Sequence, residues 1–591
     1  MSPLAAVATL AIHGRSPGEL PTWCDIAEHL VGGAVVALDP PADSAVCDLL
    51  GPLYELMLAD PVRRSSGAHF TRRTLADGLV AAATSARSDL RAEPNELIVD
   101  PACGGGAFLL AAARHLRASR PGRRPPSADE VLGRLVAADL DPDVLVVARA
   151  AMARWALDEG GAGVDSGVAV GAPTTVCADA LTRPEALSSA IAGRRVGLVV
   201  GNPPFLAQLR AGTRHDARRR ARLTERFGSQ VGAYTDTAAL FLLASLDLVD
   251  DGGVVCLIQP RSVLAARDAA GVRREVAARA RLHAAWVGDG GFDASVEVWA
   301  PILVGSTDGA PPSGKPGPVP VLGGPAAESR LGTVSGEALT PDSWGALVAA
   351  SEGLPSVGRS SGRPMGRLGE VARFGAGFRD EYYAMAELVE EAPGATLPDG
   401  YAALVSSGLI DPGECRWGAA TMRFAKRRWR APVVALDRLT GQTAPTRWAR
   451  RQLVPKVLVA SQTRVIEAAG DARGAAIGLT PVVSGFPEDI SLAHLLAVLC
   501  SPVATLQVAR TMAGSGMGRS GVRVSAKALA DLDLPVEQAP WDEAASLLSA
   551  TCDLGSGPTV ATLHAVHELM VAAAAVDDPV GVLAWFEAAT A

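Results

Sequence analysis

The chain has 591 residues, 48% of them apolar, so it has room for about two to four domains of roughly 100–200 residues with buried cores. Its 55 basic against 63 acidic residues give a net charge of −8, which excludes a protein that coats nucleic acid through overall positive charge. Eight cysteines without a Cys-x-x-Cys pair argue against a metal site or a disulfide framework and indicate a reducing, cytoplasmic setting. Uninterrupted apolar runs are too short for a transmembrane helix, so we expect no membrane partner.

Residues 1–60 are apolar and follow a helical pattern, and they carry no side chains with recognisable chemistry. The start of the chain lacks a basic leader and a cleavage pattern, so we interpret it as mature sequence and not as a signal peptide. We predict an N-terminal helical segment over 1–60.

Between residues 61 and 305, short apolar runs alternate with helical stretches such as Phe108–Ala118 and Pro142–Ala156. Short runs rich in Val, Leu and Ile are typical of buried strands in a mostly parallel sheet. The runs are Leu97–Val99, Leu135–Ala138, Thr175–Cys177, Val196–Val200, Val254–Ile258 and Val296–Val304. This alternation predicts a doubly wound, Rossmann-like α/β domain over 61–305.

A Gly- and Pro-rich stretch at 306–325 follows that domain. Such a composition is a poor former of helix or strand, so we predict a linker there. The rest of the chain has mixed patterns without a visible repeat, and we predict one C-terminal α/β domain over 326–591.

The first predicted strand leads into a glycine-rich turn that opens a helix. The turn and the helix start contain Asp100, Pro101, Ala102, Cys103, Gly104, Gly105, Gly106 and Phe108. Glycine lets the backbone approach a ligand that a Cβ would block, and the helix offers N–H groups and a partial positive charge. Strand, glycine turn and helix in this order are typical of a nucleotide-binding turn.

Aspartates end the next two predicted strands. Asp139, followed by Leu140, suits the two hydroxyls of a ribose, and Asp179, followed by Ala180, can accept a hydrogen bond from an adenine amino group. Each aspartate alone is equally consistent with a helix N-cap. Together with the glycine turn, they predict a nucleotide-like cofactor along one edge of the sheet.

The fourth strand, Val196–Val200, is followed by Asn202, Pro203, Pro204 and Phe205, which begin 102 positions after Asp100. With the glycine turn, this motif resembles the γ-class of adenine-N6 DNA methyltransferases, which serve restriction-modification and phage-defence systems. The resemblance implies that 61–305 is an S-adenosylmethionine-dependent methyltransferase domain and that 326–591 recognises the target sequence. It also implies cofactor contacts from Thr71, from Asn202 and from the residues of the glycine turn and the two aspartate strand ends.

Other segments also fit the family, with two departures. Gly67–Thr71 resembles the segment that closes over the cofactor, but Arg72 stands where the family usually has proline. Gly105 stands where the family usually has serine, and we expect glycine to be tolerated because the backbone does the binding. Asp236 resembles the residue that opens the helix before the fifth strand.

The chemistry of adenine explains the Asn-Pro-Pro-Phe motif. The exocyclic amine is a poor nucleophile because its lone pair is delocalised into the ring. The Asn202 amide oxygen and the Pro203 carbonyl can accept its two hydrogens and free that lone pair, while the two prolines stiffen the turn. Phe205 offers a face for stacking a base flipped out of the duplex, and Phe292 is a candidate for a second face.

Two arginine-rich segments are candidates for contacts with double-stranded DNA. The first follows the motif and includes Arg218 and Arg219; a solvated helix face explains it equally well. The second, from Arg423 to Lys456, has ten basic residues against Asp437 alone. The candidates are Arg218, Arg219, Arg427, Arg428, Arg430, Arg450 and Arg451, with Arg519 in the glycine-rich segment 514–520.

Three alternatives remain open. Asn-Pro-Pro-aromatic motifs also serve enzymes that methylate RNA or a protein amide nitrogen. The chain can also be a DNA-reading modification subunit that needs a separate nuclease or other defence-system subunits. A fold that has lost catalysis is disfavoured by the intact Asn-Pro-Pro-Phe motif. Cytosine N4 is a further target with similar chemistry. The recognition sequence and the oligomeric state do not follow from the sequence.

Overall fold

The computed structural model of the chain divides into two compact units, unit 1 over Met1–Glu352 and unit 2 over Gly353–Ala591. Each unit is described by itself. The residues that the structure describes are 47–48, 50–52, 71–87, 95–118, 124–159, 172–205, 214–230, 235–288, 297–306, 317–341, 343–357, 366–377, 379–440, 443–512 and 522–590.

Unit 1 is built on one large sheet, to which ten strands of its described residues contribute. Their order is β10-β9-β7-β8-β5-β4-β1-β2-β3, with β6 paired to β8. Neighbours from β3 to β5 run parallel, whereas β8 is antiparallel to both β5 and β7. The strands are β1 (Leu97–Asp100), β2 (Leu135–Asp139), β3 (Thr174–Cys177), β4 (Val196–Gly201), β5 (Val254–Leu257), β6 (Gln259–Pro260), β7 (Ala280–Gly288), β8 (Val298–Gly305), β9 (Val319–Gly323) and β10 (Ser329–Val334).

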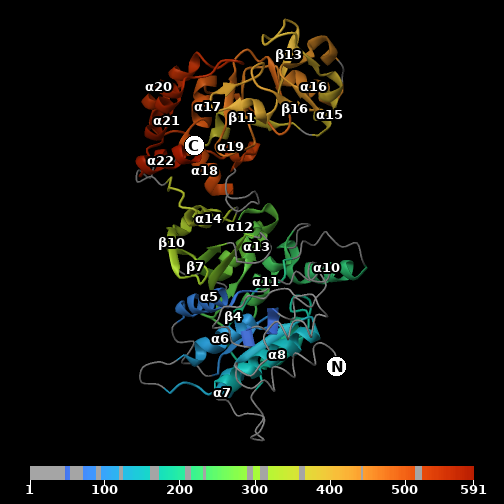
Figure 1. The fold of residues 1–591 in the computed structure, drawn as a ribbon, viewed down its shortest axis with the longest axis vertical. Helices are drawn as coiled ribbons and strands as arrows, with labels where there is room; N and C mark the ends of the chain where they lie inside the picture. Colours follow the sequence, from blue (N-terminus) through green and yellow to red (C-terminus); the bar gives the residue numbers. More distant parts are fainter. Residues whose placement is uncertain are drawn as a thin grey trace, which may run out of the picture. The chain divides into compact units, whose positions relative to one another are not determined.

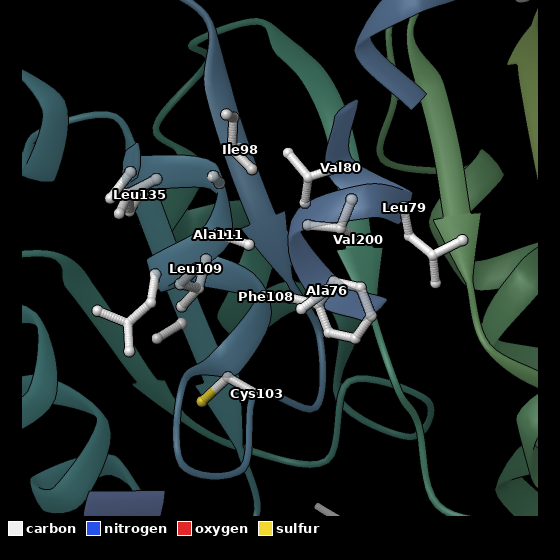
Figure 2. Packing of buried hydrophobic residues seen from close by; sticks show 14 of the residues in the cluster. Ala76, Leu79, Val80, Ile98, Cys103, Phe108, Leu109, Ala111, Leu135 and Val200 are labelled. Atoms are coloured by element: carbon white, nitrogen blue, oxygen red, sulfur yellow. The ribbon is translucent and has the colours of Figure 1, made fainter. Parts of the chain in front are cut away.

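Helices cover both faces of this sheet, because its strands are apolar on both sides. Ile98 and Val200 belong to the core that α5 and α6 cover, and Figure 2 shows them among the side chains of these helices. On the other face, α11 is buried along its whole length. The helices are α5 (Arg73–Ser85), α6 (Ala107–Arg117), α7 (Ala128–Leu132), α8 (Pro142–Asp158), α9 (Pro184–Ile191), α10 (Arg214–Phe227), α11 (Thr237–Leu246), α12 (Ser262–Ala265), α13 (Ala270–Arg279) and α14 (Ala346–Ser351).

The predicted alternation of strands and helices is confirmed, since every apolar run named above contains a strand. The prediction missed β7, whose polar and half-buried residues hide its strand character. It also missed β9, which lies inside the predicted 306–325 linker and pairs in parallel with β7. Pairing with β7 supplies hydrogen-bond partners for the backbone of β9. The Gly- and Pro-rich composition of the stretch gives no sign of these partners. The two units therefore divide at 352/353, further along the chain than the predicted linker.

The described residues of unit 2 form two four-stranded sheets, β11-β23-β19-β21 and β12-β18-β13-β22, and three two-stranded ribbons. The ribbons are β14-β15, β16-β17 and β20-β24. The strands are β11 (Ala372–Ala376), β12 (Glu390–Glu391), β13 (Tyr401–Val405), β14 (Ile410–Asp411), β15 (Glu414–Cys415), β16 (Met422–Phe424), β17 (Arg427–Trp429), β18 (Pro432–Ala435), β19 (Lys456–Val459), β20 (Gln462–Thr463), β21 (Ala468–Asp471), β22 (Ala476–Gly478), β23 (Val483–Pro487) and β24 (Val522–Arg523).

Each sheet of unit 2 has its own core. The first sheet packs with α17, α20 and α21, and the second with the β16-β17 ribbon, α15 and α16. Figure 1 shows the two groups on opposite sides of unit 2. The helices are α15 (Arg379–Leu388), α16 (Ala444–Arg451), α17 (Leu492–Leu499), α18 (Pro502–Met512), α19 (Ala526–Ala530), α20 (Gln538–Ser549), α21 (Val560–Ala574) and α22 (Pro579–Thr590).

Within the described ranges, no single helix is long and apolar enough to cross a membrane. The helices α17 and α18 reach that length only together, across a bend of 57°. Both contribute side chains to the core of unit 2, as α17 does through Leu495 and Leu499 and α18 through Ala504 and Val508.

Candidate active site

Four polar residues lie at the carboxyl ends of four neighbouring strands. In spatial order, β3, β2, β1 and β4 lead to Asp179, Asp139, Asp100 and Asn202. Because parallel strands end at the same edge of a sheet, the fold brings together residues that are up to 102 positions apart. Open parallel sheets bind ligands at this edge. This is the spatial order of the predicted cofactor contacts, with the adenine contact after β3 and the ribose contact after β2.

The glycine turn after β1 has the backbone geometry that its sequence predicts. Gly104 and Gly106 have φ values of 49° and 88°, in the left-handed region that favours glycine. The turn is tied to the sheet by Cys103, whose N–H donates to the Ala138 carbonyl at 2.9 Å. The sulfur-bearing side chain of Cys103 is buried under the turn (Figure 2). Phe108 anchors α6 in the core, so the start of the helix is held against the turn.

Asp139 joins the second strand to this turn. Its carboxylate oxygens accept hydrogen bonds from the N–H groups of Gly104 and Asp141, both at 3.0 Å. Burial raises its pKa despite these bonds. Leu140, the next residue, is 69% exposed, an unusual state for a large apolar side chain beside a buried strand end. An exposed apolar side chain next to the Asp139 carboxylate could stack against a purine ring.

Asp100 is buried behind the turn, and its Oδ1 accepts a hydrogen bond from the Ala102 N–H at 3.1 Å. Burial raises the pKa of this carboxyl well above its ordinary value, and the nearby Asp139 raises it further. A Cβ on Gly201 would lie 2.5 Å from Asp100 Oδ1, so only glycine fits at the end of β4. This close approach fixes the start of the Asn-Pro-Pro-Phe motif against the glycine turn.

Asn202 is tied to the segment that precedes α5. Its Nδ2 donates a hydrogen bond to Thr71 Oγ1 at 3.2 Å, and the threonine side chain is buried. Because Nδ2 is held on this side, the amide is oriented with Oδ1 on the opposite side as an acceptor. The structure thus brings Thr71 and Asn202 together as the resemblance implies. The preceding residues Gly67–Phe70 lie outside the described ranges.

Thr237 holds the double-proline turn, and sequence reasoning missed it. Its hydroxyl donates to the Pro204 carbonyl at 3.1 Å, and its side chain is fully buried. Asp236 caps the same helix by accepting a hydrogen bond from the Ala238 N–H at 2.9 Å, as its sequence position predicts. A threonine next to a predicted N-cap was the available signal. Phe205 is partly buried and packs against the core of unit 1.

Gly105 is crowded by the N-terminal segment. A Cβ on Gly105 would lie 2.3 Å from the Gly51 Cα, so a serine cannot replace it without displacing backbone. The segment around Gly51 is held by Asp48, which forms ion pairs with Arg114 at 2.8 Å and Arg73 at 3.2 Å. The departure from the family pattern at Gly105 therefore has a steric cause.

The arginines after the motif lie on α10. Arg218 and Arg222 are exposed, whereas Arg219 forms an ion pair with Asp179, with Nε 3.0 Å from Oδ2. Arg218 and Arg219 are the two predicted DNA contacts on this helix. Arg218 faces solvent, whereas Arg219 contacts Asp179 at the edge of the sheet where we predict the cofactor.

The second basic cluster lies on two elements that share one core. The β16-β17 ribbon carries exposed Arg427 and Arg428, and exposed Arg430 follows it, with its Nε donating to the Gly418 carbonyl at 2.9 Å. Arg450 and Arg451 are exposed on α16. Two tryptophans interleaved with these arginines, Trp429 and Trp448, are buried in the same core.

Some predictions fall outside the described residues. These are most of the predicted N-terminal helical segment 1–60, the second stacking face at Phe292 and the contact at Arg519 with its segment 514–520. Among the described residues, no group of three or more His, Cys, Asp or Glu side chains is placed to hold a metal ion.

Comparisons with known proteins agree with this geometry. The model of a family described as N-6 DNA Methylase matches residues 45–285. The match begins before the predicted domain start at residue 61 and so includes the segment around Gly51. A search of curated proteins found no match.

Three solved structures resemble this chain. The type IIL restriction-modification enzyme MmeI in complex with DNA gives a TM-score of 0.53 at 12% identity, over 99% of this chain and 89% of that chain. The type IIG restriction endonuclease BpuSI gives 0.42 at 14% identity, over 90% and 69%. A class I S-adenosylmethionine-dependent methyltransferase from Listeria monocytogenes gives 0.33 at 13% identity, over 56% and 88%. The likeness to MmeI shows a shared fold over nearly all of this chain.

The family match covers the glycine turn, the three aspartates and the Asn-Pro-Pro-Phe motif, all of which the fold brings to one edge of the sheet of unit 1. Residues 45–285 of this chain are therefore similar to the N-6 DNA Methylase family.

Proposed function

We propose that this enzyme transfers the methyl group of S-adenosylmethionine to N6 of an adenine flipped out of double-stranded DNA, within a sequence recognised by unit 2. The observation that carries the proposal is the Asn202–Thr71 hydrogen bond, which holds the amide nitrogen of Asn202 and so gives its amide one orientation. A restriction-modification or phage-defence role rests on the likeness to MmeI. We place the enzyme in the cytoplasm.

The residues at the sheet edge fit this cofactor. Asp179 would accept a hydrogen bond from the adenine amino group, and Asp139 would accept hydrogen bonds from the ribose hydroxyls. The exposed Leu140 side chain would cover one face of the purine. In the strand order Asp100 lies between Asp139 and Asn202, where the methionine end would bind. S-adenosylmethionine supplies the sulfonium methyl group. The turn residues Pro101 to Gly106 and Ala180 would contribute backbone contacts.

The motif itself would activate the adenine. Asn202 Oδ1 and the Pro203 carbonyl accept the two amine hydrogens, which draws the nitrogen toward tetrahedral geometry and frees its lone pair. Thr237 occupies the neighbouring Pro204 carbonyl and so keeps the turn rigid. The methylated amine carries positive charge and loses a proton to solvent without a strong base. Phe205, packed on the core, offers the stacking face.

The β16-β17 ribbon and α16 would contact DNA phosphates. Arg423 and Arg428 are direct cross-strand neighbours in the ribbon, and both are exposed. Like charges placed opposite one another destabilise a two-stranded ribbon, and a polyanion bound across them relieves the repulsion. The turn between them uses Ala425 and Lys426 at positive φ, which adds a further cation at its tip.

The direct test is methyl transfer by the purified chain from radiolabelled S-adenosylmethionine to double-stranded DNA of mixed sequence, with RNA and protein as parallel substrates. We expect N6-methyladenine in DNA. The Asn202→Ala variant should bind the cofactor normally and lose at least about a hundredfold in rate, as for removal of a group that stabilises developing charge. Label in RNA or protein, or in cytosine, would contradict the proposal, and a requirement for added subunits would assign this chain to a larger assembly.

A further inference from the structure

One face of the helix α10 is directed at the residues that follow β3. Arg219, Leu223 and Arg226 are spaced i, i+4 and i+7, so they share one side of the helix. Leu223 is buried, and Arg226 donates through Nη1 to the carbonyls of Ala180 and Leu181 at 2.9 and 2.8 Å. A helix face that binds a strand end in this way is fixed against the sheet.

The same face reaches the Asp179 carboxylate. Arg219 Nε donates to Asp179 Oδ2 at 3.0 Å, and the Leu181 N–H donates to Oδ1 at 3.0 Å. The carboxylate is largely buried, with 13% of its side chain exposed, while the arginine side chain is 33% exposed. Both oxygens are therefore held by donors from two different segments, which restricts rotation of the carboxylate.

We propose that Arg219 is a positioning residue of the cofactor site: it holds Asp179 in the orientation that accepts the adenine amino group of S-adenosylmethionine. The inference rests on the proposed function. Each carboxylate oxygen has a second acceptor direction in addition to the one that its present donor uses. Arg219 thereby compensates the charge of Asp179 and fixes its rotamer, and the amino group binds to a preorganised acceptor.

This role differs from the DNA contact predicted for Arg219. The predicted partner was a phosphate, whereas the structure gives the guanidinium a carboxylate partner 40 positions earlier in the chain. Arg218 and Arg222 remain exposed on other sides of α10. The helix after the catalytic motif is thus part of the wall of the adenine site.

The test measures binding of S-adenosylhomocysteine and of its analogue with hypoxanthine in place of adenine, by calorimetry on the full chain. The analogue presents an oxygen where adenine has its amino group, so it loses the hydrogen bond to Asp179. We expect wild type to prefer the adenine ligand by about ten- to a hundredfold, as for one hydrogen bond to a charged group. Asp179→Asn should reduce that preference.

Arg219→Gln should weaken binding of the adenine ligand several-fold and reduce the preference, while Arg219→Lys should restore part of both. Arg222→Gln, which removes an exposed arginine from the same helix, serves as the control and should leave cofactor binding unchanged. A merely structural role for Arg219 would weaken both ligands equally, and that result would overturn the inference. Failure of wild type to bind S-adenosylhomocysteine at all would instead overturn the proposed function.

Discussion

Asn202 Nδ2 donates a hydrogen bond to Thr71 Oγ1 at 3.2 Å, although the two residues are 131 positions apart. The bond connects the end of β4 to the segment that leads into α5. In the sequence this segment comes before β1, whereas β4 comes after it. It explains how a side-chain amide that rotates freely in solution is given one orientation.

The Thr71→Val substitution tests the orientation of the amide. Valine keeps the shape of threonine but removes the hydroxyl, so the Asn202 amide loses its fixed partner. We expect kcat to fall about tenfold, the effect of one hydrogen bond worth about 1–1.5 kcal/mol, while Thr71→Ser stays close to wild type. Thr84→Val removes a hydroxyl from α5 that bonds only the carbonyls of its own helix, and it should leave kcat unchanged. An unaltered kcat in Thr71→Val would mean that the Thr71 hydroxyl has no role in catalysis.

The Gly105→Ser substitution restores the residue that the family usually has, yet it should damage this protein. Its Cβ would lie 2.3 Å from the Gly51 Cα, and relief requires movement of backbone. We expect a loss of about 1–3 kcal/mol of unfolding free energy, as for overpacking, together with weaker cofactor binding. Gly51→Ala should be milder, because its Cβ would lie 3.1 Å from the Gly105 Cα. Thermal unfolding of both variants would show this order, and equal stability of Gly105→Ser and wild type would contradict it.

The buried Asp100 predicts a pH dependence of stability. Its folded-state pKa is raised, mainly by burial, so the folded protein retains the proton to a higher pH than the unfolded chain does. Stability therefore falls as pH rises above the ordinary aspartate value and through the raised pKa, by about 1.4 kcal/mol for each unit of difference.

Asp100→Asn cannot ionise, so we expect it to unfold at a higher temperature than wild type at pH 8 and to lose this advantage as the pH falls toward 4. Thermal unfolding of the ligand-free protein across that range is the measurement. Asp143→Asn, at an exposed position on α8, is the control and should show no such change with pH. A constant difference between Asp100→Asn and wild type would mean that the ionisation of Asp100 is not linked to folding.

The cross-strand arginines of the β16-β17 ribbon predict a salt-dependent contact. Arg423→Gln and Arg428→Gln should each weaken DNA binding and reduce the slope of log affinity against log salt by about 0.9. Neither should destabilise the free protein, because each removes a like-charge neighbour. Arg473→Gln, which removes an exposed arginine paired with Asp553 elsewhere in unit 2, should leave the slope unchanged. Unchanged slopes in the ribbon variants would exclude the ribbon from the DNA interface.

Much of unit 1 could be predicted because its signals are local. Apolar runs that end in Asp139 or Asn202 reveal both the strand and the residue at its end, and parallel topology then places those ends together. The family resemblance added Thr71, which no periodicity indicates. The roles of these residues remain predictions, since proximity alone does not establish chemistry.

The contacts missed by the sequence analysis are those made between segments. The place of Thr237 after the Asp236 N-cap does not identify Pro204 as its partner, and nothing near Arg219 signals Asp179. The exclusion of a side chain at Gly105 by Gly51 depends on how the N-terminal segment packs. In the described residues of unit 2 the strands are two to five residues long and three pairs of them form two-stranded ribbons, so periodicity does not reveal them.

The central claim, sequence-specific methylation of adenine N6, is tested most directly by single-molecule sequencing of DNA from a methylation-free host that expresses this chain alone. The account predicts N6-methyladenine at one recurring sequence motif, and its absence in a host that expresses Asn202→Ala. Modification of cytosine, or unmodified DNA from a host in which the folded wild-type chain is abundant, would contradict the claim that this chain by itself methylates adenine in DNA.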